Sequence, residues 1–313
     1  MTYVRVGLID VDGHNYPNLA LMKLSAYHKS KGDTVEWWWT DMIHYDVVYV
    51  SKVFGSEYSR NIPEPMNADR VIKGGTGYAI DLVNDREVYD KTRDPVMNAE
   101  IEAMCPDYSI YPNLTDDTAF GFLTRGCPRG CPFCHVAAKE GRKSRQVAEL
   151  KDFWRGQRDI QIMDPNILAC KDRDHLLDDL ERSRAYVDFN QGIDIRLCDN
   201  DVIDQLGRIR VKSLHFAWDN PKEDLTDYFQ KFTDRYRRKD PSRKMVYVLT
   251  NFNSTMEENL YRIEELQKRG FDPYVMIYNK PHAPEDVRAL QRWCNNKIIF
   301  NSCTWDEYDR KKG

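Results

Sequence analysis

The stretch Ala119–His135, AFGFLTRGCPRGCPFCH, decides how the rest of the sequence is interpreted. Its first six residues, which end at Thr124, are mostly apolar and predict a buried strand. Cys127, Cys131 and Cys134 follow within eight residues, in a loop rich in glycine and proline. Thiolates this close together can surround one metal centre, and soft sulfur ligands select zinc, copper or an iron–sulfur cluster. The stretch therefore predicts a strand that leads directly into a metal-binding loop.

The number of thiolates favours an iron–sulfur cluster over zinc. A structural zinc site needs four ligands. The nearest fourth candidate is His135, but it adjoins Cys134, so the two side chains are expected to diverge, and the sequence has no second Cys-x-x-Cys pair. Three cysteines on a [4Fe–4S] cluster leave one iron with an open position, as a catalytic metal requires. The alternative is a zinc-stabilised module that binds nucleic acid.

A repeated strand-then-helix pattern surrounds this loop in the second half of the chain. The clearest helix is Met256–Arg269, where Thr255 and Glu258 form a capping box. Six β-α units are consistent with a partial (β/α)₆ barrel, whose chemistry is expected at the C-terminal ends of the strands. The predicted strands are 119–124, 159–163, 187–189, 213–217, 245–249 and 274–277.

At the cysteine loop the sequence resembles the radical S-adenosylmethionine (radical SAM) superfamily, whose pattern is Cys-x₃-Cys-x-Φ-Cys with an aromatic Φ. Phe133 occupies the Φ position. The resemblance covers residues 116–313 and implies that Cys127, Cys131 and Cys134 bind three irons of a [4Fe–4S] cluster, while S-adenosylmethionine chelates the fourth. It further implies reductive cleavage of S-adenosylmethionine to a 5′-deoxyadenosyl radical, and a reductant such as flavodoxin or ferredoxin as partner.

The resemblance also implies cofactor contacts at the ends of the next four strands. Many family members hold the methionine amine with a Gly-Gly-Glu stretch, whereas this chain has Asp164 or Asn166 to accept such hydrogen bonds. Arg196 is expected to pair with the methionine carboxylate. For each position, a loop cap or a substrate contact is the ordinary alternative. The full candidate set is Asp164, Asn166, Gln191, Asp194, Arg196, Asp219 and Asn251.

Residues 1–115 predict a separate Rossmann-like open sheet, and residues 116–313 the partial barrel. The layout resembles the cobalamin-binding-like domain that precedes the barrel in one radical SAM subgroup. It consists of a strand at 3–9, a helix at 17–31, strands at 34–39 and 46–52, and a glycine turn at 74–77.

Cobalamin itself is not favoured by the sequence. Domains with an axial histidine carry Asp-x-His-x-x-Gly, and this chain has Asp12 and His14 but Pro17 in place of the glycine. The turn Gly74–Gly77 keeps cobalamin as an alternative, because glycines let a backbone approach a large flat ligand. A cobalamin-dependent methyltransferase is therefore the second hypothesis, and another radical reaction on an unidentified substrate is the first.

The run Trp37–Trp39 is unusual, because neighbouring side chains of a strand face opposite sides. At least one of these rings is thus expected to face solvent or another part of the protein, with core packing as the ordinary alternative. An interdomain or substrate contact is the functional interpretation.

Composition limits the remaining possibilities. The 313 residues carry a net charge of −4, with 11 basic and 17 acidic residues in 1–115 against 35 and 33 in 116–313. The balance does not favour nucleic acid as a partner. We expect a cytoplasmic protein, because no apolar run is long enough for a membrane helix and no signal peptide is evident. In a reducing compartment we expect the scattered cysteines to be buried apolar residues: Cys105, Cys170, Cys198, Cys294 and Cys303.

Overall fold

The computed structural model describes residues 3–13, 15–84, 86–95, 97–237 and 244–309. By its contacts the chain divides into two compact units. Unit 1 comprises residues 1–121, 130–140 and 148–158, and unit 2 comprises 122–129, 141–147 and 159–313. The boundary expected between residues 115 and 116 stays a prediction. Among the described helices, none has the length and apolar character needed to cross a bilayer.

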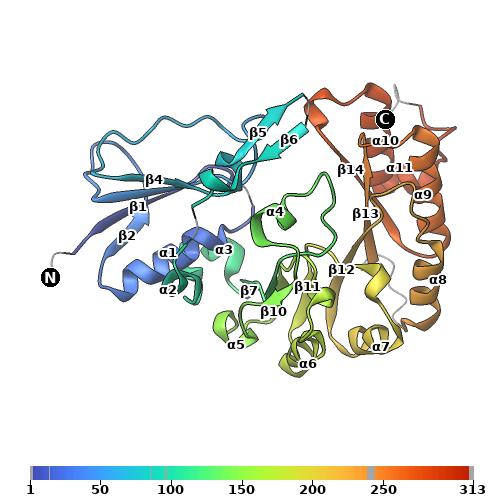
Figure 1. The fold of residues 1–313 in the computed structure, drawn as a ribbon, viewed down its shortest axis with the longest axis horizontal. Helices are drawn as coiled ribbons and strands as arrows, with labels where there is room; N and C mark the ends of the chain where they lie inside the picture. The colour runs from blue at the N-terminus through green and yellow to red at the C-terminus, as the bar shows by residue number, and fades with distance from the viewer. Residues whose placement is uncertain (1–2, 14, 85, 96, 238–243, 310–313) are drawn as a thin grey trace. The chain divides into compact units, whose positions relative to one another are not determined.

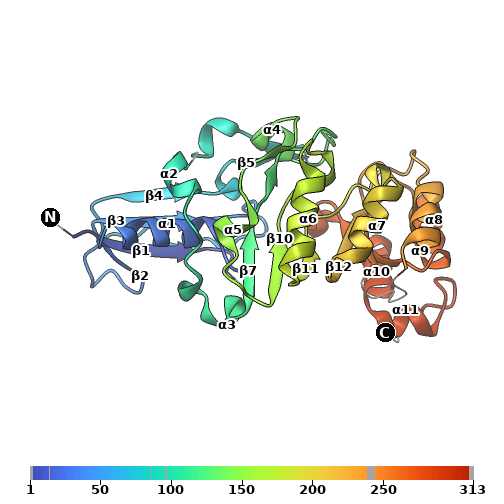
Figure 2. The same ribbon diagram turned by 90° about the horizontal axis from the view of Figure 1, so that it is seen from below.

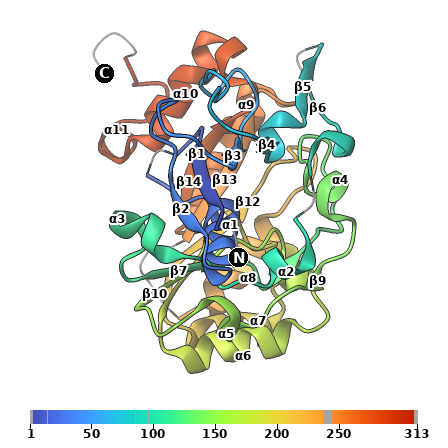
Figure 3. The same ribbon diagram turned by 90° about the vertical axis from the view of Figure 1, so that its left-hand side faces the viewer.

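Unit 1 is built on a parallel sheet with the order β2-β1-β3-β4 (Figures 2 and 3). One helix, α1, packs on this sheet and joins β1 to β2. This order is that of an open Rossmann-like sheet, as predicted. The elements are β1 (Arg5–Asp10), α1 (Leu19–Ser30), β2 (Thr34–Trp37), β3 (Val47–Ser51) and β4 (Val71–Gly74).

Helix α1 begins two residues later than predicted because Asn18 caps it. The Asn18 side chain accepts a hydrogen bond from the Leu21 backbone N–H at 3.2 Å, which satisfies one of the free donors at a helix start. Leu21 and Leu24 are buried against Val6 and Leu8 of β1. The helix therefore stabilises the sheet, because its apolar face is buried against β1.

Several short elements of unit 1 lie outside this sheet. The hairpin of β5 and β6 was not predicted, because its apolar side chains are exposed and leave no buried face to detect. These elements are β5 (Ile80–Val83), β6 (Arg86–Tyr89), α2 (Ala99–Glu102), α3 (Pro112–Thr115), β7 (Thr118–Gly121), α4 (Val136–Glu140) and α5 (Leu150–Phe153).

The predicted strand-and-helix pattern of the second half is confirmed. Strands β10 to β14 pair in parallel in chain order, so that their order across the sheet of unit 2 is β14-β13-β12-β11-β10. Helices α6 to α10 follow one another along one face of it (Figure 1). The elements are β8 (Thr124–Arg125), β9 (Arg145–Gln146), β10 (Asp159–Ile162), α6 (Arg173–Ser183), β11 (Tyr186–Phe189), α7 (Asn200–Arg208), β12 (Val211–Ala217), α8 (Thr226–Arg235), β13 (Lys244–Thr250), α9 (Met256–Lys268), β14 (Asp272–Ile277), α10 (Glu285–Asn295) and α11 (Lys297–Ser302).

The two faces of this sheet differ in chemistry. On the helix side, Phe216 of β12 packs edge-on against Phe229 and Phe232 of α8 and against Phe271, with ring centroids 5.1 to 6.2 Å apart. The opposite face carries half-buried polar residues, as the site below shows. The apolar face of the sheet packs against the helices. Polar side chains that could contact a ligand lie at the strand ends and on the other face.

The glycine turn of unit 1 packs tightly against the backbone that follows β3. A Cβ on Gly75 would lie 2.3 Å from the Lys52 carbonyl oxygen, and one on Gly77 would lie 2.0 Å from the Phe54 carbonyl oxygen. Gly75 also has φ +97°. The two glycines are therefore explained by this tight turn, without a ligand.

We expect Gly75→Ala to lower the free energy of unfolding by about 2 kcal/mol or more, because it combines a clash with backbone and an unfavourable φ. The matched control is Gly207→Ala in α7, where an added Cβ meets nothing within 4 Å. It should instead stabilise by about 0.5–1 kcal/mol, since alanine favours a helix. Chemical denaturation measures both, and equal effects would contradict this explanation of the turn.

Candidate functional site

The cysteine loop begins at a backbone segment held by one buried carboxylate. Asp164, just after β10, accepts hydrogen bonds from the backbone N–H of Leu123 at 2.7 Å and from the N–H and hydroxyl of Thr124 at 2.6 Å each. Its side chain is buried, and burial raises its pKa to about 7 against the lowering effect of these bonds. Asp164 thus ties the end of β10 to the start of the loop.

A second contact fixes the backbone at Cys127. Its N–H donates to the Gly141 carbonyl at 3.1 Å, beside the short ladder of β8 and β9. Gly126 has φ +90°, and a Cβ there would lie 2.3 Å from the Lys143 carbonyl oxygen. Only glycine fits this position, so residues 141–143 set the path of the chain into the first cysteine.

The three loop cysteines are more accessible than most of the scattered ones. Cys127 and Cys131 are half-buried and Cys134 is exposed, whereas Cys170, Cys198 and Cys294 are buried as expected. The other two, Cys105 and Cys303, are half-buried. The Cys134 N–H donates to the Cys131 carbonyl at 3.0 Å and closes a turn between these two ligands.

His135, the fourth candidate for zinc, has another partner. Its Nε2 lies 3.0 Å from the Glu87 carboxylate, and its ring lies 5.9 Å from that of Tyr89, both on β6. The side chain of His135, the fourth zinc ligand that the sequence offered, is therefore engaged by β6.

A polar network in unit 2 joins Cys127 to three predicted residues. The Asn166 amide nitrogen donates to Cys127 Sγ at 3.7 Å and to Asp194 Oδ2 at 3.5 Å. Asp194 also accepts from Arg129 at 2.5 Å and from Arg196 at 2.7 Å. Among the described residues, the buried Asn166 Oδ1 has no hydrogen-bond partner. A buried acceptor without a partner is costly, so this oxygen marks a place for a donor supplied by a ligand.

Charge balance in this network is set by arginines. Burial alone would raise the pKa of Asp194, but hydrogen bonds from Arg196 and Arg129 hold it below its ordinary value. Arg196 also donates through Nη1 to Glu223 at 2.7 Å, and its pKa is raised because these two carboxylates outweigh desolvation. Asp194 is therefore an anion that orients both arginines and Asn166.

Among the described residues, Gln191, Asp219 and Asn251 share no hydrogen bond with this network. Gln191 is exposed and Phe133 is half-buried. Burial raises the pKa of Asp219 to about 6, with Arg262 opposing. Asn251, with φ +62°, donates its amide N–H to the Tyr278 carbonyl at 2.8 Å. Their predicted roles stay predictions.

The sequence analysis missed a polar cluster on the sheet face opposite the helices. Buried His215 donates from Nδ1 to the Phe189 carbonyl at 3.1 Å, which leaves Nε2 as an acceptor 3.2 Å from Ser213 Oγ. Asp188 lies 3.4 Å from Nδ1, and Tyr247 stacks on the imidazole with centroids 5.6 Å apart. Alternation of polar residues along β11 and β12 is the signal that could have revealed it. The cluster brings an imidazole, a carboxylate and a hydroxyl together on that face.

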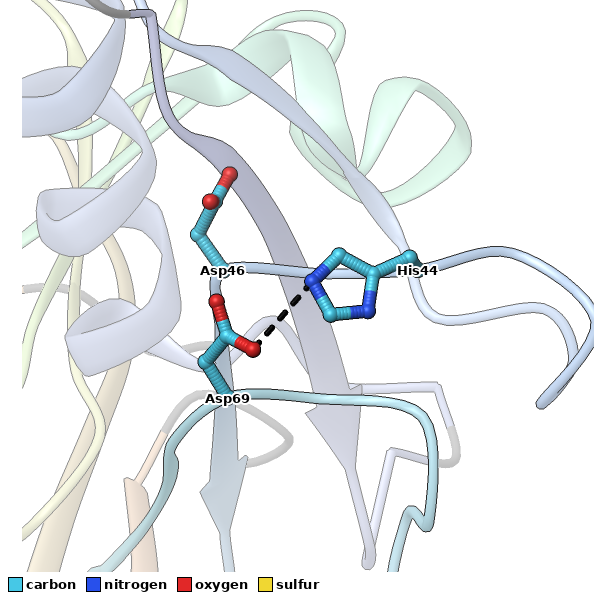
Figure 4. A group of neighbouring side chains, drawn as sticks. All are labelled: His44, Asp46 and Asp69. Atoms are coloured by element: carbon cyan, nitrogen blue, oxygen red, sulfur yellow. Dashed lines mark ion pairs between the residues drawn. The ribbon is translucent and has the colours of Figure 1, made fainter.

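One further group of ionisable residues lies on the surface of unit 1. His44, Asp46 and Asp69 are all exposed, with His44 Nε2 3.3 Å from Asp69 (Figure 4). The His44 pKa is raised by its hydrogen bond to Asn67 and by the nearby carboxylates. Exposed carboxylates are satisfied by water, so we assign the group no function.

Comparisons with known proteins are consistent with this geometry at the level of the fold. No family model matches the sequence, and no curated protein matches it significantly. Among solved structures, the chain is similar to the radical S-adenosylmethionine methyltransferase TsrM from Kitasatospora setae, whose structure contains cobalamin and a [4Fe–4S] cluster. The TM-score is 0.59 at 12% identity, over 88% of this chain and 75% of TsrM. The predicted fold class and the resemblance in fold are thereby confirmed.

We expect Asp164→Asn to change how stability depends on pH. The folded pKa of about 7 lies above the ordinary value of 3.8, so the folded state binds this proton more tightly. In the native protein, this group's contribution is full below about pH 4 and is lost as the pH rises to about 7, a change on the order of a few kcal/mol. The variant lacks this titration.

Chemical denaturation at several pH values measures the effect as the difference between the two proteins. Asp174→Asn, at an exposed side chain of α6, serves as a control for adding an amide elsewhere in unit 2. A difference between native protein and Asp164→Asn that is constant from pH 4 to 8 would contradict the prediction.

Proposed function

We propose that this protein is a radical SAM enzyme that acts on an unidentified substrate. The observation that carries the proposal is the three-cysteine loop, whose start is held by Asp164 at the end of β10. Asn166, which contacts Cys127, also has a side-chain oxygen without a partner among the described residues. The likeness of fold to TsrM supports it.

The donor set fits a [4Fe–4S] cluster with one open iron. Cys127, Cys131 and Cys134 would hold three irons, and Phe133 lies between the last two. When bound, the cluster supplies the electron that cleaves S-adenosylmethionine to methionine and a 5′-deoxyadenosyl radical. The protein's part is to orient the reactants and exclude competing reactions.

The polar network is suited to the methionine end of S-adenosylmethionine. Asn166 Oδ1 would accept a hydrogen bond from the ammonium group, because it is an acceptor without a partner. Arg196 uses Nε and Nη1 for Asp194 and Glu223, and Nη2 is left for the methionine carboxylate. Asp164, engaged with the backbone of the loop, would position that loop instead of the ammonium. Asp219, Asn251 and Gln191 are the further candidates for ribose, adenine or substrate.

A redox protein is the partner that this chemistry requires. Arg142 and Lys143 are exposed and have no ion pair among the described residues, and their segment packs on Gly126 and Cys127. Arg129, Lys171 and Arg173 line a cavity of about 750 Å³ together with Asp174. Such a surface favours an acidic reductant of the flavodoxin or ferredoxin class.

Substitution of the cysteines tests the proposed function. We expect Cys131→Ala to abolish assembly of the cluster on anaerobic reconstitution, whereas Cys170→Ala, at a buried cysteine outside the loop, should leave it intact. Iron and sulfide analysis, visible absorbance of the cluster, and cleavage of S-adenosylmethionine with dithionite are the measurements. A colourless protein with stoichiometric zinc, or loss of the cluster in the Cys170 variant, would contradict the assignment.

Cobalamin-dependent methyl transfer is the second candidate function, favoured by the likeness to TsrM. The glycine turn does not support it, since Gly75 and Gly77 approach the backbone of Lys52 and Phe54 and so leave no open cradle there. His14, the candidate axial ligand, lies outside the described residues. We therefore keep the sequence-based preference for a reaction without cobalamin.

Titration with hydroxocobalamin, followed by absorbance, distinguishes the two candidates. We expect no stoichiometric binding. Tight binding of one equivalent that His14→Ala weakens would instead assign methyl transfer and an axial histidine. Tight binding that His14→Ala leaves unchanged would assign methyl transfer without that ligand.

A further inference from the structure

Unit 1 contains a cavity that the proposed function does not use. It has a volume of about 460 Å³ and lies at the C-terminal ends of β1 and β2. We call it the aromatic pocket. Ligand sites of open α/β sheets occur at this edge, and their volumes are of this order. Its lining residues are Leu8, Ile9, Asp10, Gly13, Trp37, Trp38 and the segment 110–114.

The aromatic side chains of the pocket are held in place by specific contacts. Trp37 donates its indole N–H to the Ile110 carbonyl at 3.2 Å. Its ring meets that of Tyr111 edge-on, with centroids 5.1 Å apart. Trp37 nevertheless remains 38% exposed. Ring surface that is oriented and still accessible is suited to packing against a flat ligand.

One carboxylate provides polarity within this lining. Asp10, the last residue of β1, accepts the Tyr111 hydroxyl at 2.5 Å. Burial raises the Asp10 pKa, and hydrogen bonds from Tyr111, Asn18 and the Asp12 backbone oppose the effect. A carboxylate accepts about four hydrogen bonds, so with these three donors Asp10 keeps capacity for one further donor. The lining residues that the structure describes include no lysine or arginine, which disfavours phosphate or another anion.

We propose that the aromatic pocket binds a flat nitrogen heterocycle of purine size, which packs on Trp37 and Tyr111 and donates one N–H group to Asp10. This site accounts for part of the Trp37–Trp39 run, since Trp37 and Trp38 line the pocket. Trp39 does not line it and is 82% exposed. The inference stands independently of the cysteine loop.

Guanosine is the probe, because its base carries an exocyclic amino group that can donate an N–H to Asp10, and inosine lacks that group. We expect guanosine to quench tryptophan fluorescence saturably in the full-length protein, and inosine to bind roughly tenfold more weakly, as for one hydrogen bond to a charged group. Asp10→Asn should reduce guanosine binding to the level of inosine. Trp37→Leu should weaken both nucleosides.

Two controls keep this test specific. Trp39→Phe should leave the affinity unchanged, and Tyr111→Phe, which keeps the ring and the Asp10 carboxylate, should retain the preference for guanosine. The proposal is overturned by the absence of saturable quenching, by equal losses in the Trp39 and Trp37 variants, or by loss of the preference in Tyr111→Phe. Displacement of guanosine by hydroxocobalamin would also overturn it, because the cavity would then belong to that cofactor.

Discussion

The carboxylate of Asp164 is the contact on which the candidate site depends. It lies at the end of β10 and takes both N–H groups of the Leu123–Thr124 backbone, together with the Thr124 hydroxyl. A buried carboxylate is tolerated when several donors satisfy it, and these donors come from the chain that runs into Cys127. The end of β10 therefore fixes the backbone that leads into Cys127.

From that point the site extends through polar contacts within unit 2. Asn166 lies two residues after Asp164 and contacts Cys127, and Asp194 after β11 holds Asn166 and two arginines. Because neighbouring parallel strands end at one edge of a sheet, residues from two β-α units meet there. On the sheet face opposite the helices, His215 lies beside Asp188 and Ser213.

Unit 1 shows how the same residue type can have different causes. Gly75 and Gly77 are needed because their turn packs against the backbone of Lys52 and Phe54, and so they do not indicate a cofactor. The tryptophans of the β2 region differ in the same way, since Trp37 lines a pocket whereas Trp39 is exposed to solvent. A pattern of residues is thus interpretable only with its neighbours in space.

The sequence by itself determined the parallel sheet of the second half, the capping box at Thr255, and the spacing of the three cysteines, because periodicity, capping and ligand spacing are local properties of the chain. It also selected Asn166, Asp194 and Arg196 from their places after strands. Only the tertiary structure decided that Asp164 binds backbone, that Asn166 keeps an unpaired oxygen, that His215 faces Asp188, and that Asp10 and Trp37 share a cavity. Those facts depend on strand register and on which segments pack together, and neither is encoded in any short stretch of residues.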